Sequence, residues 1–304
     1  MLALSLNIAM LLNTLDNKRI SESDVVIIFG PTGSGKTDLA ISIIKEMKLE
    51  SKAVVISADS RQVYMGMDIG TNKDVNKFKE LGIEVKGVDI LNPNESYSVF
   101  DFYTLAMKEI EEAKKKGCKV IIVGGTGLYL DSLIYEKEYI GLNIDKVNEN
   151  IEYSYEEVKD KLITEFTEEW NKLNESEKKN LKRLRIIYER LNNSDNSFET
   201  KPLKDFVLVT PKYDREKLYE KINLRVEKMF KDGLVEEVKN LIKNGFENTE
   251  SMKGTGYKEI VSYLKNEIIL EEVKESIKRS HRHYAKRQIT WFKKYFNDFK
   301  VISI

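Results

Sequence analysis

The sequence is poor in the residues that build disulfide frameworks and zinc sites. Cys118 is the single cysteine among 304 residues, and there are two histidines, His281 and His283. One cysteine excludes an internal disulfide and a cysteine-based zinc site, and it is typical of a reducing compartment. The spacing of the histidines fits no metal site, and we expect both side chains to be solvated.

An excess of charge of one sign is also absent. Lys plus Arg and Asp plus Glu each number 50, so the net charge predicts no polyanionic partner. The distribution is uneven, because residues 136–179 are mainly acidic and the stretch from residue 278 onward contains a single acid, Asp298. This asymmetry indicates either a surface that faces nucleic acid or the solvated face of a helix. The basic residues of the stretch are Lys278, Arg279, Arg282, Lys286, Arg287, Lys293, Lys294 and Lys300.

Long hydrophobic runs are absent too. The apolar stretch over residues 1–12 lacks a basic leader and a small-residue cleavage site, and it is too short to span a bilayer. We interpret residues 1–20 as an N-terminal extension, either an added helix or residues upstream of the natural start, with Met10 as an alternative start. We expect a cytoplasmic protein with no membrane partner.

What the sequence does contain is a phosphate-binding loop. Residues 25–29 are apolar, as in a buried parallel strand, and a helical pattern follows the loop after them, which has the spacing of a P-loop. Its glycines let consecutive N–H groups point into one hollow at the positive end of a helix. The alternative is a turn that only caps the helix. We predict that a di- or triphosphate binds to Gly30, Pro31, Thr32, Gly33, Ser34, Gly35, Lys36 and Thr37, with the Thr37 hydroxyl as a ligand of Mg²⁺.

Further strands are expected to bring polar residues to the same place. Residues 53–57, 85–90 and 119–123 are predicted strands, and residues 98–116 form a predicted helix. Asp59 follows the first of these strands, and ligands gather at the carboxyl ends of parallel strands, so we expect Asp59 close to the P-loop. Three roles stay open for it: a Mg²⁺ ligand, a general base or a helix N-cap.

The regular alternation of strands and helices ends near residue 135. Residues 137–202 are charged and helical in pattern, with helices expected over 151–170 and 175–191. A strand-like run at 206–209 then returns to the sheet, which makes the middle segment an insertion. Helical patterns follow over 214–243, interrupted at Gly233, and over 270–299 after a glycine-containing loop at 253–257.

These elements predict an α/β fold, a P-loop NTPase-like parallel sheet flanked by helices, with a helical insertion domain and a helical C-terminal region. The predicted segments are an extension (1–20), the first part of the P-loop core (21–136), the helical insertion domain (137–202), and the completion of the core with basic C-terminal helices (203–304).

The motifs resemble those of the tRNA dimethylallyltransferases, also called tRNA isopentenyltransferases, of the bacterial type. The most specific of them is Asp-Ser-Arg-Gln-Val-Tyr at residues 59–64, which follows the P-loop. The resemblance covers about residues 25–135 and 205–295. It also includes Asp89-Ile90, Tyr97-Ser98, Val123–Tyr129, Asp214-Arg215, Arg225, Gly233, Glu236–Val238, Gly256–Glu259 and Ala285–Phe292.

The resemblance implies a transferase built on a kinase-like scaffold. The P-loop would hold the diphosphate of dimethylallyl diphosphate, with Lys253 as a further diphosphate-binding residue, and Mg²⁺ would be the cofactor. The N6 atom of adenine 37 in tRNAs that read codons beginning with U would attack the allylic carbon, giving N6-(dimethylallyl)adenosine and pyrophosphate. Asp59, Lys36 and Thr37 would be the catalytic residues, with Asp59 orienting N6 and taking its proton.

The resemblance also implies contacts with the anticodon stem-loop of tRNA, and we expect a monomer. The family's signature in the insertion is largely missing here, with Arg183 as its one counterpart, and the threonine usual before the C-terminal arginine is His281. Trp291 and Phe292 are interpreted as core residues rather than as base-stacking platforms. The expected tRNA-binding residues are Asp59, Ser60, Arg61, Gln62, Thr126, Arg183, Arg282, Lys286, Arg287 and Gln288.

Three other functions stay open at this stage. A P-loop kinase could phosphorylate a nucleoside or another metabolite, but the block at residues 59–62 and the basic terminal helix speak against it. An isopentenyltransferase of free adenine nucleotides would be shorter. A paralogue that binds RNA without catalysis would fit the degenerate insertion signature, whereas the intact Lys36, Thr37 and Asp59 argue for an enzyme.

Overall fold

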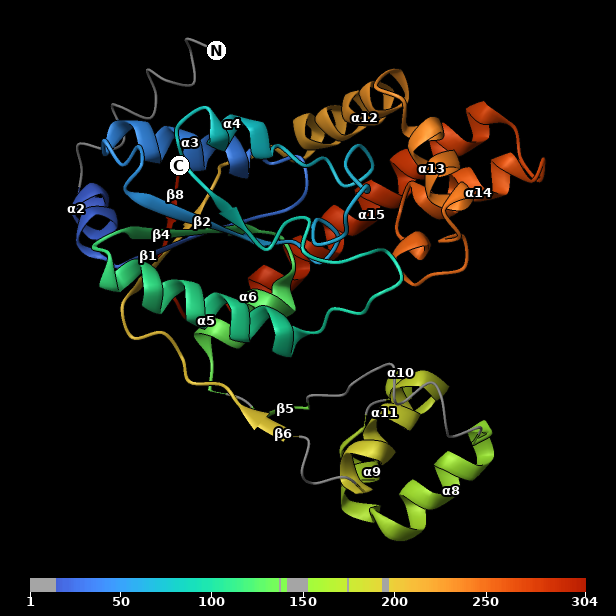
Figure 1. Cartoon of the computed structure of the whole chain (residues 1–304). Coiled ribbons are helices and arrows are strands. Elements are labelled where there is room, and N and C mark those ends of the chain that lie inside the picture. The colour runs from blue at the N-terminus through green and yellow to red at the C-terminus, as the bar shows by residue number, and fades with distance from the viewer. Residues whose placement is uncertain (1–14, 137, 141–152, 174, 193–196) are drawn as a thin grey trace.

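A six-stranded parallel sheet forms the centre of the computed structural model, which describes residues 15–136, 138–140, 153–173, 175–192 and 197–304 (Figure 1). The strand order is β3 (Val85–Lys86), β2 (Ala53–Ala58), β4 (Lys119–Gly124), β1 (Val25–Phe29), β7 (Phe206–Thr210) and β8 (Val301–Ser303). Every neighbouring pair is parallel. The predicted return of the chain to the sheet is confirmed, because Val25 pairs with Val120 on one side and with Phe206 on the other.

Helices cover both faces of this sheet, as the fold prediction requires. All five residues of β1 are buried, which is typical of a parallel strand with helices on both sides. On one face, Val26 and Ile28 pack in a cluster with α2 (Leu15–Glu22), α3 (Lys36–Glu46) and α4 (Val75–Lys79). On the other, Ile27 and Phe29 pack with α5 (Val99–Lys115), α6 (Gly127–Ile134) and the end of α15 (Leu270–Tyr295). Phe292 is buried and Trp291 partly buried in this second cluster, which confirms them as core residues.

The C-terminal helices form a third hydrophobic cluster beside the sheet. It contains α12 (Arg215–Lys231), α13 (Leu234–Lys243), α14 (Tyr257–Leu264) and α15, together with Val63, Tyr64 and Met67 from the segment after β2. The expected break at Gly233 is confirmed, since its φ of +102° ends one helix and begins the next. The short 3₁₀ helix η2 (Ser251–Lys253) and α14 flank the predicted loop at residues 253–257 and were not predicted.

The middle of the chain folds as a helical group with its own core (Figure 1). It is reached through a two-stranded antiparallel ribbon, β5 (Glu138–Ile140) and β6 (Ser197–Glu199). Its helices are α8 (Tyr155–Glu165), α9 (Thr167–Lys172), α10 (Glu175–Lys178) and α11 (Leu181–Asn192). The two continuous helices expected here are wrong, because the first is broken at Phe166 (φ −136°, ψ 49°) and the second between α10 and α11.

Two further expectations need correction. The strand predicted over 85–90 stops at Lys86, because Gly87 (φ +77°) and Asp89 (φ +54°) turn the chain, and the amides of Asp89 and Ile90 bind the carbonyls of Gln62 and Val63. The helix predicted to residue 299 ends at Tyr295, and β8 follows it. Residues 1–14 of the predicted extension lie outside the described residues.

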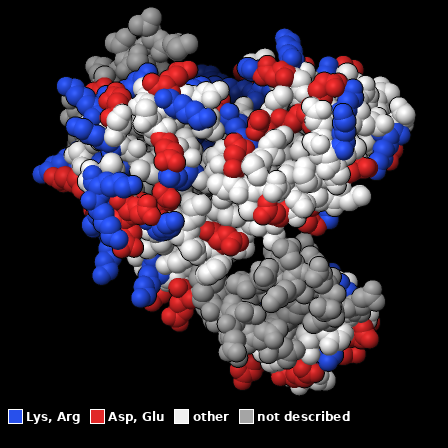
Figure 2. Space-filling view, viewed as in Figure 1, with Lys and Arg blue, Asp and Glu red and all other residues white. Residues whose placement is uncertain are grey.

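No helix among the described residues is both long enough and apolar enough to cross a membrane. Acidic and basic side chains are interspersed over the face seen in Figure 2, in keeping with their equal numbers in the sequence.

Candidate active site

A cleft of about 630 Å³ opens at the carboxyl ends of the central strands. This is the position at which open parallel sheets bind ligands. The P-loop, the segments that follow β2 and β4, α12, the loop at residues 253–258 and α15 all contribute to its wall. The prediction that Asp59 lies close to the P-loop is confirmed, because both line this cleft.

The P-loop connects β1 to α3 through backbone that needs glycine. Gly33 and Gly35 have φ values of +80° and +91°, in the left-handed region. A Cβ atom on Gly33 would also lie 3.1 Å from Ile222 Cγ1 of α12. Gly35 occupies the N-cap of α3 and offers no side-chain oxygen to the first amides of the helix, so an anion can serve as their acceptor.

Lys36 is partly buried and lies folded against its own loop. Its Nζ donates to the carbonyls of Gly30 (3.0 Å) and Pro31 (2.9 Å). The pKa of this ammonium is lowered to about 8, mainly by burial; the carboxylate of Asp59 raises the pKa and the charge of Arg225 lowers it. The cation is therefore held at the phosphate site with an acidic side chain in electrostatic reach.

Oxygen ligands for a magnesium ion are present in the cleft. Thr37, Asp38 and Asp59 all line it. Among the described residues no group of three or more His, Cys, Asp or Glu is arranged to hold a metal ion. Magnesium commonly uses one or two protein oxygens together with substrate phosphates. The residues therefore fit a Mg²⁺ ion that is held mainly by a bound diphosphate.

The segment after β2 brings Asp59, Ser60 and Thr126 together. Asp59 Oδ1 accepts a hydrogen bond from the Arg61 amide (2.9 Å), and the Ser60 amide donates to Thr126 Oγ1 (3.1 Å). The hydroxyl of Tyr284 on α15 is also hydrogen-bonded to Thr126, and burial raises the pKa of that phenol to about 12. Asp59 and Ser60 therefore line the cleft together, and Thr126 is hydrogen-bonded to the Ser60 amide.

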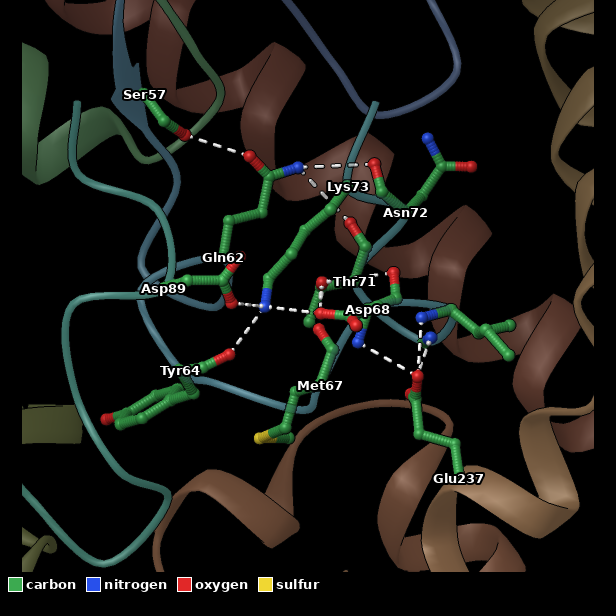
Figure 3. A network of polar contacts seen from close by, with 12 residues as sticks. Ser57, Gln62, Tyr64, Met67, Asp68, Thr71, Asn72, Lys73, Asp89 and Glu237 are labelled. Carbon is green, nitrogen blue, oxygen red and sulfur yellow. Dashed lines mark hydrogen bonds and ion pairs between the residues drawn. The ribbon is translucent and has the colours of Figure 1, made fainter. Parts of the chain in front are cut away.

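Arg61 and Gln62 line the cleft, but their polar groups bind the protein itself. Gln62 accepts from Ser57 Oγ (2.9 Å) and donates to the carbonyls of Thr71 and Asn72 (3.3 Å each), as Figure 3 shows. The Arg61 guanidinium donates to the Glu250 carbonyl (3.3 Å). Both side chains therefore order the wall of the cleft.

Gln288 has a different environment from the one predicted. Its side chain is buried, accepts from the Thr32 amide (2.8 Å) and donates to the Gly125 carbonyl (2.8 Å). A Cβ atom on Gly125 would lie 2.2 Å from Gln288 Nε2, so any larger residue there would displace this amide. The expectation that Gln288 contacts tRNA phosphates is wrong, because both ends of its amide connect α15 to the P-loop.

The remaining predicted cations are spread around this region. Arg287 is exposed, lines the cleft and lies 5.6 Å from the centre of the Tyr284 ring. Lys286 is exposed, and Arg282 donates to Asn223 Oδ1 (2.6 Å). Lys253 lines the cleft and forms an ion pair with Glu250. Arg183 lies on α11, and its side chain is outside the described part of the structure.

Arg225 on α12 belongs to the motifs that carry the family resemblance, but no site role was predicted for it. Its Nε donates to Asn72 Oδ1 (2.9 Å) and its Nη1 donates to Thr32 Oγ1 (2.7 Å). Burial lowers the pKa of this guanidinium, against the raising effect of Asp74 and Asp59. The signal in the sequence is a cation on the apolar face of a helix, between the buried Ile222 and Met229.

His281 is a second difference from expectation. It lines the cleft instead of facing solvent, and its Nε2 is buried without a hydrogen-bond partner. Burial, helped by the charge of Arg225, lowers the pKa of its imidazole to about 4. The side chain is therefore neutral at physiological pH.

Together these groups suit a displacement at a phosphate-bearing carbon. Amides, Lys36 and Arg225 can hold a diphosphate and stabilise charge that develops on it. Asp59 can accept a proton from the nucleophile that attacks this carbon.

The comparisons with known proteins point to one group of proteins. A family model described as IPP transferase matches residues 62–295. The chain is 41% identical over 292 residues to the tRNA dimethylallyltransferase of Acetivibrio thermocellus, covering 90% of each chain. It is 41% identical over 283 residues to that of Clostridioides difficile, covering 89% of each.

Solved structures give the same result. The tRNA isopentenylpyrophosphate transferase of Bacillus halodurans superimposes with a TM-score of 0.65 at 32% identity, covering 93% of this chain and 90% of the other. A eukaryotic dimethylallyltransferase acting on tRNA gives a TM-score of 0.73 at 22% identity, covering 92% of this chain and 73% of the other, and at that identity the likeness concerns the fold.

Proposed function

The chain belongs to the IPP transferase family, and from this premise we propose that it is a tRNA dimethylallyltransferase. It transfers the dimethylallyl group of dimethylallyl diphosphate to N6 of adenine 37 in tRNAs that read codons beginning with U. It acts in the cytoplasm, where tRNA is modified, and as a monomer.

The diphosphate binds in the P-loop. Backbone N–H groups of the P-loop and the ammonium of Lys36 surround its oxygens, and Arg225 lies beside them through its bond to Thr32. Lys253 contributes at the outer side of the cleft. Thr37 would hold a Mg²⁺ ion together with the diphosphate, and that ion would neutralise charge on the leaving group. Preorganised donors of this type contribute about 3–4 kcal/mol each in comparable sites.

Asp59 serves the nucleophile. The lone pair of adenine N6 is delocalised into the ring, so N6 attacks more readily when a carboxylate orients it and removes its proton. The bond from N6 to the allylic carbon forms as the bond from that carbon to the diphosphate oxygen breaks. The proton passes to Asp59 and pyrophosphate leaves. The ammonium of Lys36 is the group that balances the growing negative charge.

The tRNA presents adenine 37 after the base has left the anticodon-loop stack, at a cost of a few kcal/mol. Ser60 and Thr126 lie next to Asp59 and contact the base or its neighbours. The anticodon arm is held by Lys286, Arg287, Arg282 and the helical insertion with Arg183, through backbone phosphates. Arg61 and Gln62 support this region by fixing the segment that follows β2.

The observation that supports the proposal most strongly is that Asp59 and Lys36 line one cleft, with the Asp59 carboxylate within electrostatic reach of the Lys36 ammonium. The test is transfer of label from dimethylallyl diphosphate, with Mg²⁺, to an anticodon stem-loop that has adenine at positions 36, 37 and 38. Label that enters only this stem-loop, and not one with guanine at position 37, supports the proposal. The Asp59→Ala protein should incorporate far less.

Other outcomes of this experiment separate the alternatives. Label in free AMP indicates an isopentenyltransferase of free nucleotides. Phosphate transferred from ATP to a small acceptor indicates a kinase. Stem-loop binding with no transfer to any acceptor indicates an RNA-binding protein without catalysis.

A further inference from the structure

The segment at residues 67–73 has no helix or strand of its own, yet it forms part of the cleft wall. Thr71 and Asn72 line the cleft, and Asn72 has a φ of +52°, which an asparagine tolerates but does not prefer. A segment of this kind adopts one conformation only where its surroundings fix it.

Glu237 on α13 provides the main constraint (Figure 3). Its Oε2 accepts from the amides of Asp68 (2.9 Å) and Ile69 (2.7 Å), and its Oε1 accepts from the amide of Gly70 (3.1 Å). The hydroxyl of Tyr257 donates to the same Oε1 (2.8 Å). Four donors fill the acceptor sites of one carboxylate, and hydrogen bonds to a charged acceptor are the stronger kind.

Two further features keep the segment in place. A Cβ atom on Gly70 would lie 2.5 Å from the ring of Tyr257, so the backbone is pressed against α14. On the opposite side, Lys73 has a side chain that is 3% exposed and forms ion pairs with Asp68 (2.8 Å) and Asp89. It also donates to the Tyr64 carbonyl.

The segment acts on the phosphate site through Asn72. Asn72 Oδ1 accepts from Arg225 Nε, and the same guanidinium donates to Thr32 of the P-loop. Asn72 Nδ2 faces Asp74 Oδ2 at 3.3 Å, which orients the amide so that its oxygen points at the arginine.

We propose that Glu237 is a positioning residue for diphosphate binding. Its carboxylate fixes residues 68–70, which sets Asn72 so that Arg225 is aimed at the P-loop. This rests on the proposed function, in which that loop binds the diphosphate. Glu237 itself contacts no substrate, because its carboxylate is already saturated by protein donors.

The test is the affinity of the full chain for pyrophosphate in the presence of Mg²⁺, measured by calorimetry. Glu237→Gln places an NH₂ group against backbone amides, and we expect pyrophosphate to bind about tenfold more weakly. The affinity for the anticodon stem-loop should change less than about twofold, because the base-facing residues are untouched. The control is Glu236→Gln on the same helix. The exposed side chain of Glu236 accepts from Lys239 Nζ and faces solvent, so this substitution should leave pyrophosphate affinity unchanged.

A second variant keeps the proposal testable if Glu237→Gln does not fold. Asn72→Ala removes the acceptor of Arg225 and should weaken pyrophosphate binding by a similar factor. If both variants fold, the double variant should bind about as weakly as either single one, because both act through the same arginine. A purely structural glutamate would lower thermal stability without this change in affinity.

Unchanged pyrophosphate affinity in Asn72→Ala, or additive losses in the double variant, would overturn the proposal. So would a wild-type chain that binds no pyrophosphate. A wild-type chain that binds pyrophosphate but transfers no prenyl group contradicts the proposed function alone, and the variants still decide the role of Glu237.

Discussion

At the scale of single residues, the ammonium of Lys36 lies against two carbonyls of its own loop, those of Gly30 and Pro31. A lysine in this position must exchange backbone oxygens for phosphate oxygens when a ligand binds. Because its pKa is about 8, Lys36 is charged in neutral solution and loses its charge as the pH rises above 8.

This predicts a pH dependence of binding. Below pH 8 Lys36 is already protonated, so its ionisation should cause no change in pyrophosphate affinity with pH. Above it, each bound ligand must draw a proton onto Lys36, so affinity should fall by about tenfold per pH unit. Calorimetry from pH 6.5 to 9.5 measures this.

The comparison protein is Lys36→Arg, whose guanidinium stays charged over that range. The ratio of the two affinities cancels the titration of pyrophosphate itself. A ratio that is constant with pH would show that the Lys36 pKa lies outside the range.

Asp59 gives the second prediction at this scale. Asp59→Asn keeps the shape of the side chain and can still accept from the Arg61 amide, but it cannot take a proton. We expect kcat for prenyl transfer to fall by about 10²–10⁴-fold, with little change in the KM for dimethylallyl diphosphate. Steady-state kinetics with the stem-loop measure both constants, and a rise in KM without loss of kcat would assign Asp59 to binding.

Some residue roles could be predicted from the sequence and others could not. The P-loop and Asp59 follow strands that are easily identified, so topology places them together. Arg225 and His281 lie on long helices, and which face of such a helix meets the cleft depends on how α12 and α15 pack. Gln288 was misassigned for the same reason.

At the scale of elements, the length of a strand decides whether it can be predicted from the sequence. The strands β1, β2, β4 and β7 are five or six residues long and almost wholly apolar, and all four were predicted. The strands β5, β6 and β8 have three residues each, too few to show a period. They exist because a distant partner strand supplies their hydrogen bonds.

The contact between α15 and the P-loop gives a prediction at this scale. Gln288→Ala leaves the Thr32 amide and the Gly125 carbonyl without their side-chain partner, so we expect the free energy of unfolding to fall by about 1–3 kcal/mol. Urea denaturation measures it. Thr290→Ala, which removes an exposed hydroxyl bonded to the Lys286 carbonyl, is the control.

An opposite result would restore the original assignment. If Gln288→Ala unfolds like the wild type but binds the stem-loop more weakly, the amide faces RNA and not the P-loop.

At the scale of the whole molecule, the net charge is zero although the C-terminal stretch from residue 278 onward is basic. The numbers of acidic and basic residues are equal, and both signs mix on the face shown in Figure 2. Binding of a polyanion must therefore come from a few cations placed at the cleft, and it should be sensitive to the loss of any two.

The corresponding prediction concerns salt. Substituting Lys286 and Arg287 together with alanine removes two positive charges. The plot of log association constant for the stem-loop against log salt concentration should then be less steep, its negative slope reduced in magnitude by about 1–2. Fluorescence anisotropy at several salt concentrations measures the slope. Lys239→Ala, at an exposed position of α13, is the control, and an unchanged slope in the double variant would remove Lys286 and Arg287 from the RNA contact.

The pairing of β1 with both β4 and β7 has a consequence for how the chain is made. One edge of β1 pairs with β7, where Val25 lies opposite Phe206. Because β7 follows the insertion and its ribbon in the sequence, this edge of β1 stays uncovered until those residues have been synthesised. At about 5–20 residues per second this takes on the order of 10–40 seconds on the ribosome. During that time an apolar strand edge is open to other chains. Nascent chains halted before residue 206 should therefore bind chaperones, and chains that extend well past 210 should release them.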